Sequence, residues 1–200
     1  MTDRLTSTAE GIARAAELLA SGEVVAFPTD TVYGVAVAAS RPDRVAALFE
    51  LKGRPVDRRI PLLVADLDQA TTAGWDADDR ARQLAERFWP GALTIVLPGP
   101  EATQAFRAPD HPVALALIGA AGPLFATSAN RSDEPDTLGA DDVLIAFATR
   151  QDELAAVIDD GPVPGGVAST VIDLSATPAR ILREGPITRA SLSESVEVGE

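Results

Sequence analysis

The sequence predicts a three-layer α/β fold, in which helices cover both faces of a twisted, mixed sheet of about seven strands. Short apolar runs alternate along the chain with segments whose apolar residues recur at helical spacing. Some runs, such as residues 24–27, are apolar at every position, which suits strands buried on both faces. Two pairs of predicted strands are too close along the chain to be joined by a crossover helix: residues 24–27 with 35–39, and residues 169–174 with 180–183. This spacing indicates some antiparallel pairing.

The helical pattern is clearest over residues 8–20, where Ile12, Ala15 and Leu19 share one face and Gly22 stands at the position of a left-handed C-cap. Residues 40–51 form a second predicted helix, which Gly53 ends in the same way. Further helices are expected at residues 67–72, from residue 76 to 88, at 113–120, from 141 onward and from 188 onward.

The remaining apolar runs predict strands, and the chain has no linker-like or repetitive stretch between them. These strands are expected at residues 24–27, 35–39, 61–64, 93–97, 124–126, 157–158, 169–174 and 180–183. Residues 98–109 are expected to form a loop, with Arg107 near its end. We therefore predict a single domain over residues 1–200, with its core between about residues 8 and 192.

The composition excludes several classes of protein. The chain has 200 residues, of which 46% are apolar and 24% charged, as in an ordinary globular protein. It contains no cysteine, which excludes disulfides and thiolate metal sites. No apolar run approaches the ~20 residues of a membrane-spanning helix, and no secretory pattern opens the chain, so we expect a cytoplasmic protein without membrane contact. The only histidine, His111, is predicted to be a cap or turn residue, and no metal site built from protein ligands is expected.

Positive charge is concentrated in one short segment of an otherwise acidic chain. The formal net charge is −13, which disfavours broad binding to nucleic acid. Residues 52–59 nevertheless contain Lys52, the only lysine, together with Arg54, Arg58 and Arg59. An arginine fork matches the geometry of a phosphate or carboxylate, so this segment is a candidate for gripping the phosphates of a nucleotide. A solvated basic loop is the alternative.

Three further polar clusters follow predicted strands, at residues 28–34, 127–132 and 169–170, and Arg107 and Arg183 add isolated cations. Polar turns that leave buried strands are frequent sites of ligand contact in α/β proteins. For Thr29 and Asp30 the competing interpretation is a turn whose side chains bond to their own backbone.

Read together and in order, these clusters resemble the YrdC-like (TsaC-type) family of threonylcarbamoyl-AMP synthases. The resemblance extends over nearly the whole chain, and its agreement in seven ordered motifs is highly specific. The matching stretches are Pro-Thr-Asp-Thr-Val-Tyr-Gly (28–34), Leu-Lys-Gly-Arg-Pro (51–55), Phe-Trp-Pro-Gly-Ala-Leu-Thr (88–94), Arg-Ala-Pro-Asp-His-Pro (107–112), Ser-Ala-Asn-Arg-Ser (128–132), Ala-Ser-Thr-Val-Ile-Asp (168–173) and Ile-Leu-Arg-Glu-Gly (181–185).

The resemblance implies a fold and a reaction. The fold is a twisted mixed sheet with helices on both sides. The reaction joins L-threonine, bicarbonate and ATP into threonylcarbamoyl-AMP and pyrophosphate, with Mg²⁺ carried on the phosphates rather than in a protein cage. A downstream transferase then modifies tRNA, and direct tRNA contact by this chain is expected to be weak or indirect.

The same resemblance implies roles for individual residues. Threonine would contact Thr31, Arg107 and Ser169. The family's Lys-x-Arg pair matches Lys52 and Arg54, and its Ser-x-Asn pair matches Ser128 and Asn130. The resemblance implies that these four residues are catalytic and bind ATP. The residues expected to contact ATP are Lys52, Arg54, Arg58, Ser128, Asn130 and Arg183.

Several positions depart from the family pattern, and they leave alternatives open. The stretch between Leu97 and Arg107 is short and lacks the apolar strand that precedes this arginine in the family, with Gln104-Ala105-Phe106 as its substitute. Asp133 and Glu184 replace a usual glycine and a usual proline. One alternative is a paralogue that adenylates another carbamoyl substrate. The other is a non-catalytic RNA-binding or ribosome-maturation protein on the same fold, against which the net charge argues.

Overall fold

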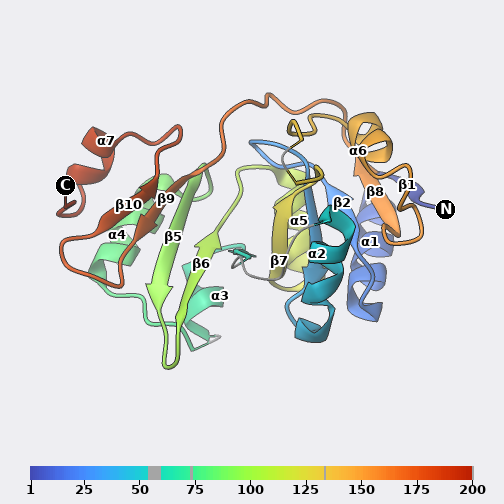
Figure 1. The fold of residues 1–200 in the computed structure, drawn as a ribbon. Helices are drawn as coiled ribbons and strands as arrows, with labels where there is room; N and C mark the ends of the chain where they lie inside the picture. Colours follow the sequence, from blue (N-terminus) through green and yellow to red (C-terminus); the bar gives the residue numbers. More distant parts are fainter. Residues whose placement is uncertain (54–59, 73, 133, 200) are drawn as a thin grey trace.

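The computed structural model describes residues 1–53, 60–72, 74–132 and 134–199, and Figure 1 shows their arrangement. Ten strands of the described residues form one mixed sheet in the order β1-β8-β2-β3-β7-β4-β6-β5-β9-β10. The strands are β1 (Asp3–Thr6), β2 (Val25–Phe27), β3 (Gly34–Ala38), β4 (Leu62–Leu63), β5 (Leu93–Pro98), β6 (Thr103–Arg107), β7 (Leu124–Ser128), β8 (Ala156–Asp159), β9 (Thr170–Asp173) and β10 (Arg180–Arg183).

The helices follow the apolar periodicity of the sequence closely. They are α1 (Ala9–Ser21), the 3₁₀ turn η1 (Pro42–Arg44), α2 (Val45–Lys52), α3 (Leu67–Thr72), α4 (Asp79–Phe88), α5 (Pro112–Ala121), α6 (Ala140–Ala146) and α7 (Arg189–Ser193). Gly22 and Gly53 end α1 and α2 in the left-handed conformation, as expected for C-cap glycines. Within the described ranges, none of the helices combines the length and the apolar composition of a membrane span.

The predicted mixed α/β sheet is confirmed, but the count of about seven strands was too low. The strand β1 was not predicted, because it is a polar edge strand, Asp-Arg-Leu-Thr, without the apolar alternation that marks a buried strand. The strand β6 was assigned to the loop 98–109. It pairs antiparallel with β5 and places Gln104-Ala105-Phe106 in the sheet, so the strand that seemed to be missing before Arg107 is present.

Helices cover both faces of one half of the sheet, as Figure 1 shows. Alternate residues of β2 and β3 belong to separate hydrophobic clusters. Val25 and Phe27 pack in the cluster of α1 and α5, whereas Ala26 and Val35 pack with α2 and α6 on the other face. Side chains alternate between faces along a strand, so this half has the three layers predicted from its continuous apolar runs.

The other half of the sheet, built from β5, β6, β9 and β10, has its apolar cluster on one face only. Leu93, Ile95, Phe106 and Ile172 point to the face packed with α3, α4 and α7. The alternate residues of the same strands, such as Thr94 and Arg107, point to the opposite face and line a cleft there. Polar residues at alternate strand positions therefore form the floor of the candidate site.

A close approach of α1 to β1 gives a prediction for stability. A Cβ atom on Gly11 would lie 2.0 Å from the carbonyl oxygen of Thr6. We expect Gly11→Ala to lower the free energy of unfolding by about 1–2 kcal/mol, because this edge strand must shift to admit a methyl group. Gly119→Ala in α5, where nothing lies within 4 Å of the added Cβ, is the matched control. It should be neutral or stabilise by up to about 1 kcal/mol in urea denaturation. Equal effects of the two substitutions would contradict the packing argument.

Candidate active site

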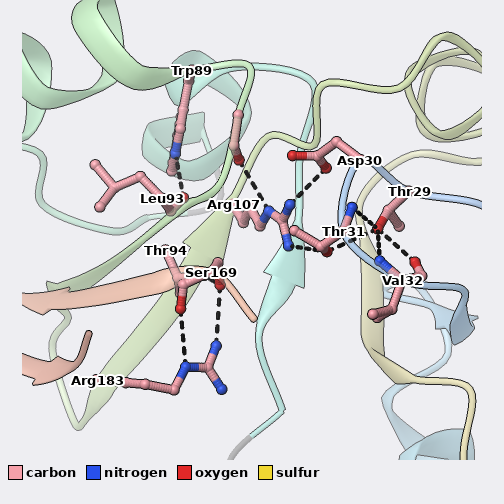
Figure 2. A network of polar contacts seen from close by, with 11 residues as sticks. Thr29, Asp30, Thr31, Val32, Trp89, Leu93, Thr94, Arg107, Ser169 and Arg183 are labelled. Carbon is pink, nitrogen blue, oxygen red and sulfur yellow. Dashed lines mark hydrogen bonds and ion pairs between the residues drawn. The ribbon is translucent and has the colours of Figure 1, made fainter. Parts of the chain in front are cut away.

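A cleft of about 490 Å³ lies on the uncovered face of the sheet, between its two halves. Its walls come from the 28–34 turn, strands β4 to β7, strands β9 and β10, and the segment around Asp136. Among the residues that the structure describes, the polar side chains in these walls are hydroxyls, two guanidinium groups and one carboxylate. Figure 2 shows the hydrogen-bonded network along its floor.

The turn after β2 fixes the hydroxyl of Thr31. The hydroxyl of Thr29 accepts hydrogen bonds from the backbone N–H groups of Thr31 and Val32 and donates to the carbonyl of Val32. This is the local turn arrangement that was the alternative interpretation of Thr29. Thr29 Oγ1 also lies 3.1 Å from Thr31 Oγ1, and Thr31 Oγ1 accepts from Arg107 Nη1 at 3.1 Å.

Arg107, the last residue of β6, is anchored through all three guanidinium nitrogens (Figure 2). Its Nη2 donates to Asp30 Oδ1 at 2.6 Å, and its Nε donates to the carbonyl oxygen of Gly91 at 3.0 Å. The exposed fractions of the Arg107 and Asp30 side chains are only 10% and 15%. The guanidinium group is thus a rigid cation, set beside the Thr31 hydroxyl in the wall of the cleft.

Ser169, Thr94 and Arg183 form a second network on the same floor (Figure 2). The hydroxyls of Ser169 and Thr94 lie 2.8 Å apart. Arg183 reaches across from β10, donating from Nη2 to Ser169 Oγ at 3.1 Å and from Nε to the Ser169 carbonyl at 2.9 Å. The Ser169 side chain therefore holds one position, with an arginine beside it.

The charge of Arg107 acts on Arg183 within the cleft. Partial burial lowers the pKa of Arg183, and the positive charge of Arg107 lowers this pKa further, whereas Asp136 raises it. A guanidinium group nevertheless keeps its positive charge at neutral pH. Two like charges facing one space create a positive potential that an anionic ligand would neutralise.

Lys52 lies behind the other wall of the cleft. Its ammonium donates to the carbonyl oxygens of Ser128 at 2.6 Å and Asn130 at 2.7 Å, and to Asn130 Oδ1 at 3.1 Å. Ser128 Oγ, a fourth oxygen, lies 3.4 Å away and itself donates to Asn130 Oδ1 at 2.6 Å. Lys52 is only 4% exposed. The C-terminus of α2, where a cation is favoured, is thereby joined to the turn that follows β7.

Comparison with known proteins identifies the family. Residues 17–185 match the family model of the Sua5, YciO and YrdC proteins, which carries the description "Telomere recombination". The chain belongs to this family. A relative from Bacillus subtilis, named threonylcarbamoyl-AMP synthase, is 41% identical over 96% of this chain and 58% of its own length. Another of the same name, from Pyrococcus abyssi, is 39% identical over 86% of this chain and 53% of its own length.

A solved structure confirms the fold of this Sua5/YrdC family member. The crystal structure of P. abyssi Sua5 complexed with L-threonine matches with a TM-score of 0.89 and 33% identity, over 100% of this chain and 62% of that chain. The present chain thus spans little more than half the length of these relatives.

The structure brings together most of the residues that the family motifs singled out. The same cleft is lined by Thr31, Arg107, Ser169, Arg183 and Ser128. Lys52 and Asn130 are hydrogen-bonded to each other next to Ser128. Arg54 and Arg58 lie outside the described residues.

Three residues of the site were not among the candidates chosen from the sequence. Asp30 was discussed only as part of a turn, and it is the ion-pair partner of Arg107. Thr94 was placed in a strand, and its polar side chain between Leu93 and Ile95 was the available signal that one strand face is not core. Asp136 lies in a loop, and nothing in the sequence pattern marked it as a cleft residue.

His111 is the N-cap residue of α5, as expected, although its side chain makes no capping bond. Its Nδ1 is buried without a hydrogen-bond partner among the described residues, and its Nε2 lies 3.8 Å from Asp160 Oδ2. Burial lowers the pKa of His111, outweighing the nearby carboxylates of Asp160, Asp30 and Asp110, which raise it. No group of three or more His, Cys, Asp or Glu side chains is placed to hold a metal in the described ranges.

The lowered pKa of His111 predicts how stability depends on pH. The unfolded chain binds this proton more tightly than the folded protein does, so the free energy of unfolding should fall as the pH drops below about 6.5. The loss should level off below the folded-state pKa. His111→Gln should lack this component in urea denaturation between about pH 5 and 8. Because the chain has a single histidine, an NMR titration reads its pKa directly, and a midpoint above 6.5 would contradict the prediction.

Proposed function

We propose that this protein is a threonylcarbamoyl-AMP synthase, a nucleotidyltransferase that makes threonylcarbamoyl-AMP and pyrophosphate from L-threonine, bicarbonate and ATP. One observation carries the proposal. Thr31 with Arg107, and Ser169 with Arg183, converge on a single cleft in a chain that shares its fold with a threonine-bound Sua5 structure. Two cations and several fixed hydroxyls suit a pair of anionic substrates.

In this proposal the amino acid lies over Thr31, Arg107 and Ser169. A guanidinium group that is already fixed by Asp30 and Gly91 can attract a carboxylate without first losing side-chain freedom. The hydroxyls of Thr31 and Ser169 are held by Arg107 and Arg183, so they offer hydrogen bonds in set directions. This pre-organisation favours one small, polar amino acid over larger ones.

ATP would lie beside the amino acid in the same cleft, between the wall that carries Ser128 and the wall that carries Arg183. The Ser128–Asn130 turn and its Lys52 anchor form this wall, and Arg54 and Arg58 are proposed as further ATP contacts from the family motif alone. The threonine amino group would add to carbon dioxide derived from bicarbonate to give a carbamate. A carbamate oxygen would then attack the α-phosphorus, and pyrophosphate would leave. Positioning and charge neutralisation supply most of the catalysis in such a step.

Magnesium fits this site as an ion carried by the nucleotide. Mg²⁺ is usually held by one or two carboxylates together with substrate phosphates and water. In the described lining of the cleft the carboxylate is that of Asp136, close enough to Arg183 to influence its pKa. Asp136 would hold the hydrated ion, which would neutralise phosphate charge.

The broader setting is proposed on the same basis. The continuous ten-stranded sheet supports one domain over residues 1–200. A product adenylate that hydrolyses readily needs an acceptor close by, which is consistent with a cytoplasmic partner transferase that modifies tRNA. The net charge of −13 supports a weak or indirect contact between this chain and tRNA.

The test is pyrophosphate release in the presence of ATP, bicarbonate, Mg²⁺ and individual amino acids. We expect release that depends on both threonine and bicarbonate, with threonylcarbamoyl-AMP as the product in mass spectrometry. Omission of bicarbonate is the matched control. Release that is equal with all amino acids would favour a paralogue with another carbamoyl substrate, and no release under any condition would contradict the assignment.

A further inference from the structure

Lys52 has no donor to spare for a phosphate. An ammonium group carries three N–H donors, and Lys52 Nζ already has four oxygen atoms of Ser128 and Asn130 within 3.4 Å. Two of these are backbone carbonyl oxygens at 2.6 and 2.7 Å, which are short, charge-assisted contacts. A phosphate could reach this nitrogen only by displacing one of them from a buried position.

The position of Lys52 also separates it from the cleft. Ser128 is part of the cleft wall, whereas Lys52 and Asn130 are not among its described lining residues. Among the described residues, the ammonium contacts the Ser128–Asn130 turn, and Ser128 is the member of this turn that lines the ligand space. The backbone of Lys52 is joined to the residues just after this turn, because the N–H of Ser132 donates to the Lys52 carbonyl at 3.1 Å.

The hydrogen bonds around Asn130 determine what Ser128 presents to the cleft. Asn130 Nδ2 donates to the carbonyl of Glu134 at 2.6 Å, which identifies Oδ1 as the oxygen that faces Lys52 and Ser128. The Ser128 hydroxyl proton is directed to that oxygen at 2.6 Å. Ser128 Oγ then offers its lone pairs to the cleft, so it acts as an acceptor. An acceptor suits a hydroxyl or amine of a nucleoside better than it suits a phosphate oxygen.

We propose that Lys52 is a positioning residue, which holds the Ser128–Asn130 turn from behind so that Ser128 accepts a hydrogen bond from the nucleoside part of the substrate. Lys52 does not bind the triphosphate. This inference rests on the proposed function, because it assumes that the cleft binds ATP, and it changes the role that the family motif suggested for this lysine.

The proposal is tested by comparing ligands that differ in phosphate number. The dissociation constants of adenosine, AMP and ATP are measured by calorimetry for the wild type, Lys52→Met and Arg183→Met. Lys52→Met should weaken all three ligands by a similar factor, about tenfold to a hundredfold, since the damage lies in the turn. Arg183→Met should weaken ATP more than adenosine, because its guanidinium lies in the cleft. The proposal would be overturned if Lys52→Met weakened the affinity for ATP by a factor at least ten times larger than the factor for adenosine.

A second measurement does not depend on whether Lys52→Met folds. Lys52 is the only lysine, so reductive methylation of the wild-type chain modifies a single side-chain amine, which is distinguished from the α-amino group by peptide mapping. Methylation of Lys52 should be slow with or without ATP, because the buried ammonium is held by oxygen atoms of the protein. Rapid methylation that ATP suppresses would contradict the proposal. Failure of the wild type to bind ATP would instead contradict the proposed function, and the methylation rate would still test the positioning of Lys52.

Discussion

Arg107→Met is expected to lower the free energy of unfolding by about 3 kcal/mol, because it leaves the Asp30 carboxylate largely buried without its partner. The substitution also removes donors to Thr31 Oγ1 and to the Gly91 carbonyl, so the two walls of the cleft lose their connection. Threonine affinity should fall by about tenfold or more, since a charged hydrogen-bonding group is lost from the proposed amino-acid site. Urea denaturation and calorimetry with threonine measure the two effects.

Two controls separate the contribution of this ion pair from a general effect of removing an arginine. Arg14→Met removes an exposed i,i+3 pair with Glu17 and should change the stability by no more than about 0.5 kcal/mol. Arg107→Lys keeps the charge but loses the planar fork, so it should restore part of the stability and little of the threonine affinity. A stability loss for Arg107→Met as small as that of Arg14→Met would show that the buried pair contributes little.

The sequence was sufficient to predict three layers for the half of the sheet around β2 and β3. It also singled out five residues that line the cleft, namely Thr31, Arg107, Ser128, Ser169 and Arg183. Apolar alternation decides which faces of β2 and β3 are buried, and the turn chemistry around Thr29 is local, so both can be read from neighbouring residues. The strand order cannot be read from neighbouring residues, because it depends on pairings between distant segments. For example, β6 lies between β4 and β5, and β8 lies between β1 and β2. Edge strands such as β1 also escape detection, since one polar, exposed strand has no periodic apolar signal.

Lys52 illustrates the same limit within the site. Its charge and the Lys-x-Arg motif suggested a phosphate contact, and both can be read from neighbouring residues of the chain. Its hydrogen-bond partners Ser128 and Asn130 are 76 and 78 residues away, and only the packed structure shows that they saturate the ammonium. A motif match indicates that a residue belongs to a site, whereas the geometry shows which atoms this residue contacts.

Gly185→Ala is expected to disable the site from outside the cleft. A Cβ atom on Gly185 would lie 2.4 Å from the Ala168 carbonyl oxygen, 2.5 Å from the Thr170 nitrogen and 2.7 Å from the Ser169 carbonyl carbon. All three are backbone atoms that cannot rotate away, so the segment 168–170 must move. We expect a loss of about 3 kcal/mol in the free energy of unfolding, at the upper end for overpacking.

The functional effect of Gly185→Ala should exceed its effect on stability, because the displaced backbone carries Ser169. Ser169 Oγ is held at once by Thr94 and by Arg183, and Arg183 also bonds the Ser169 carbonyl, so a shift of this segment breaks all three contacts. Threonine-dependent pyrophosphate release measured below the unfolding transition should therefore fall at least about tenfold, as expected when a positioned reactant is misplaced by an ångström. Gly119→Ala, which meets no atom within 4 Å, should retain full activity. A folded Gly185→Ala variant with normal activity would mean that the position of Ser169 does not matter for the reaction.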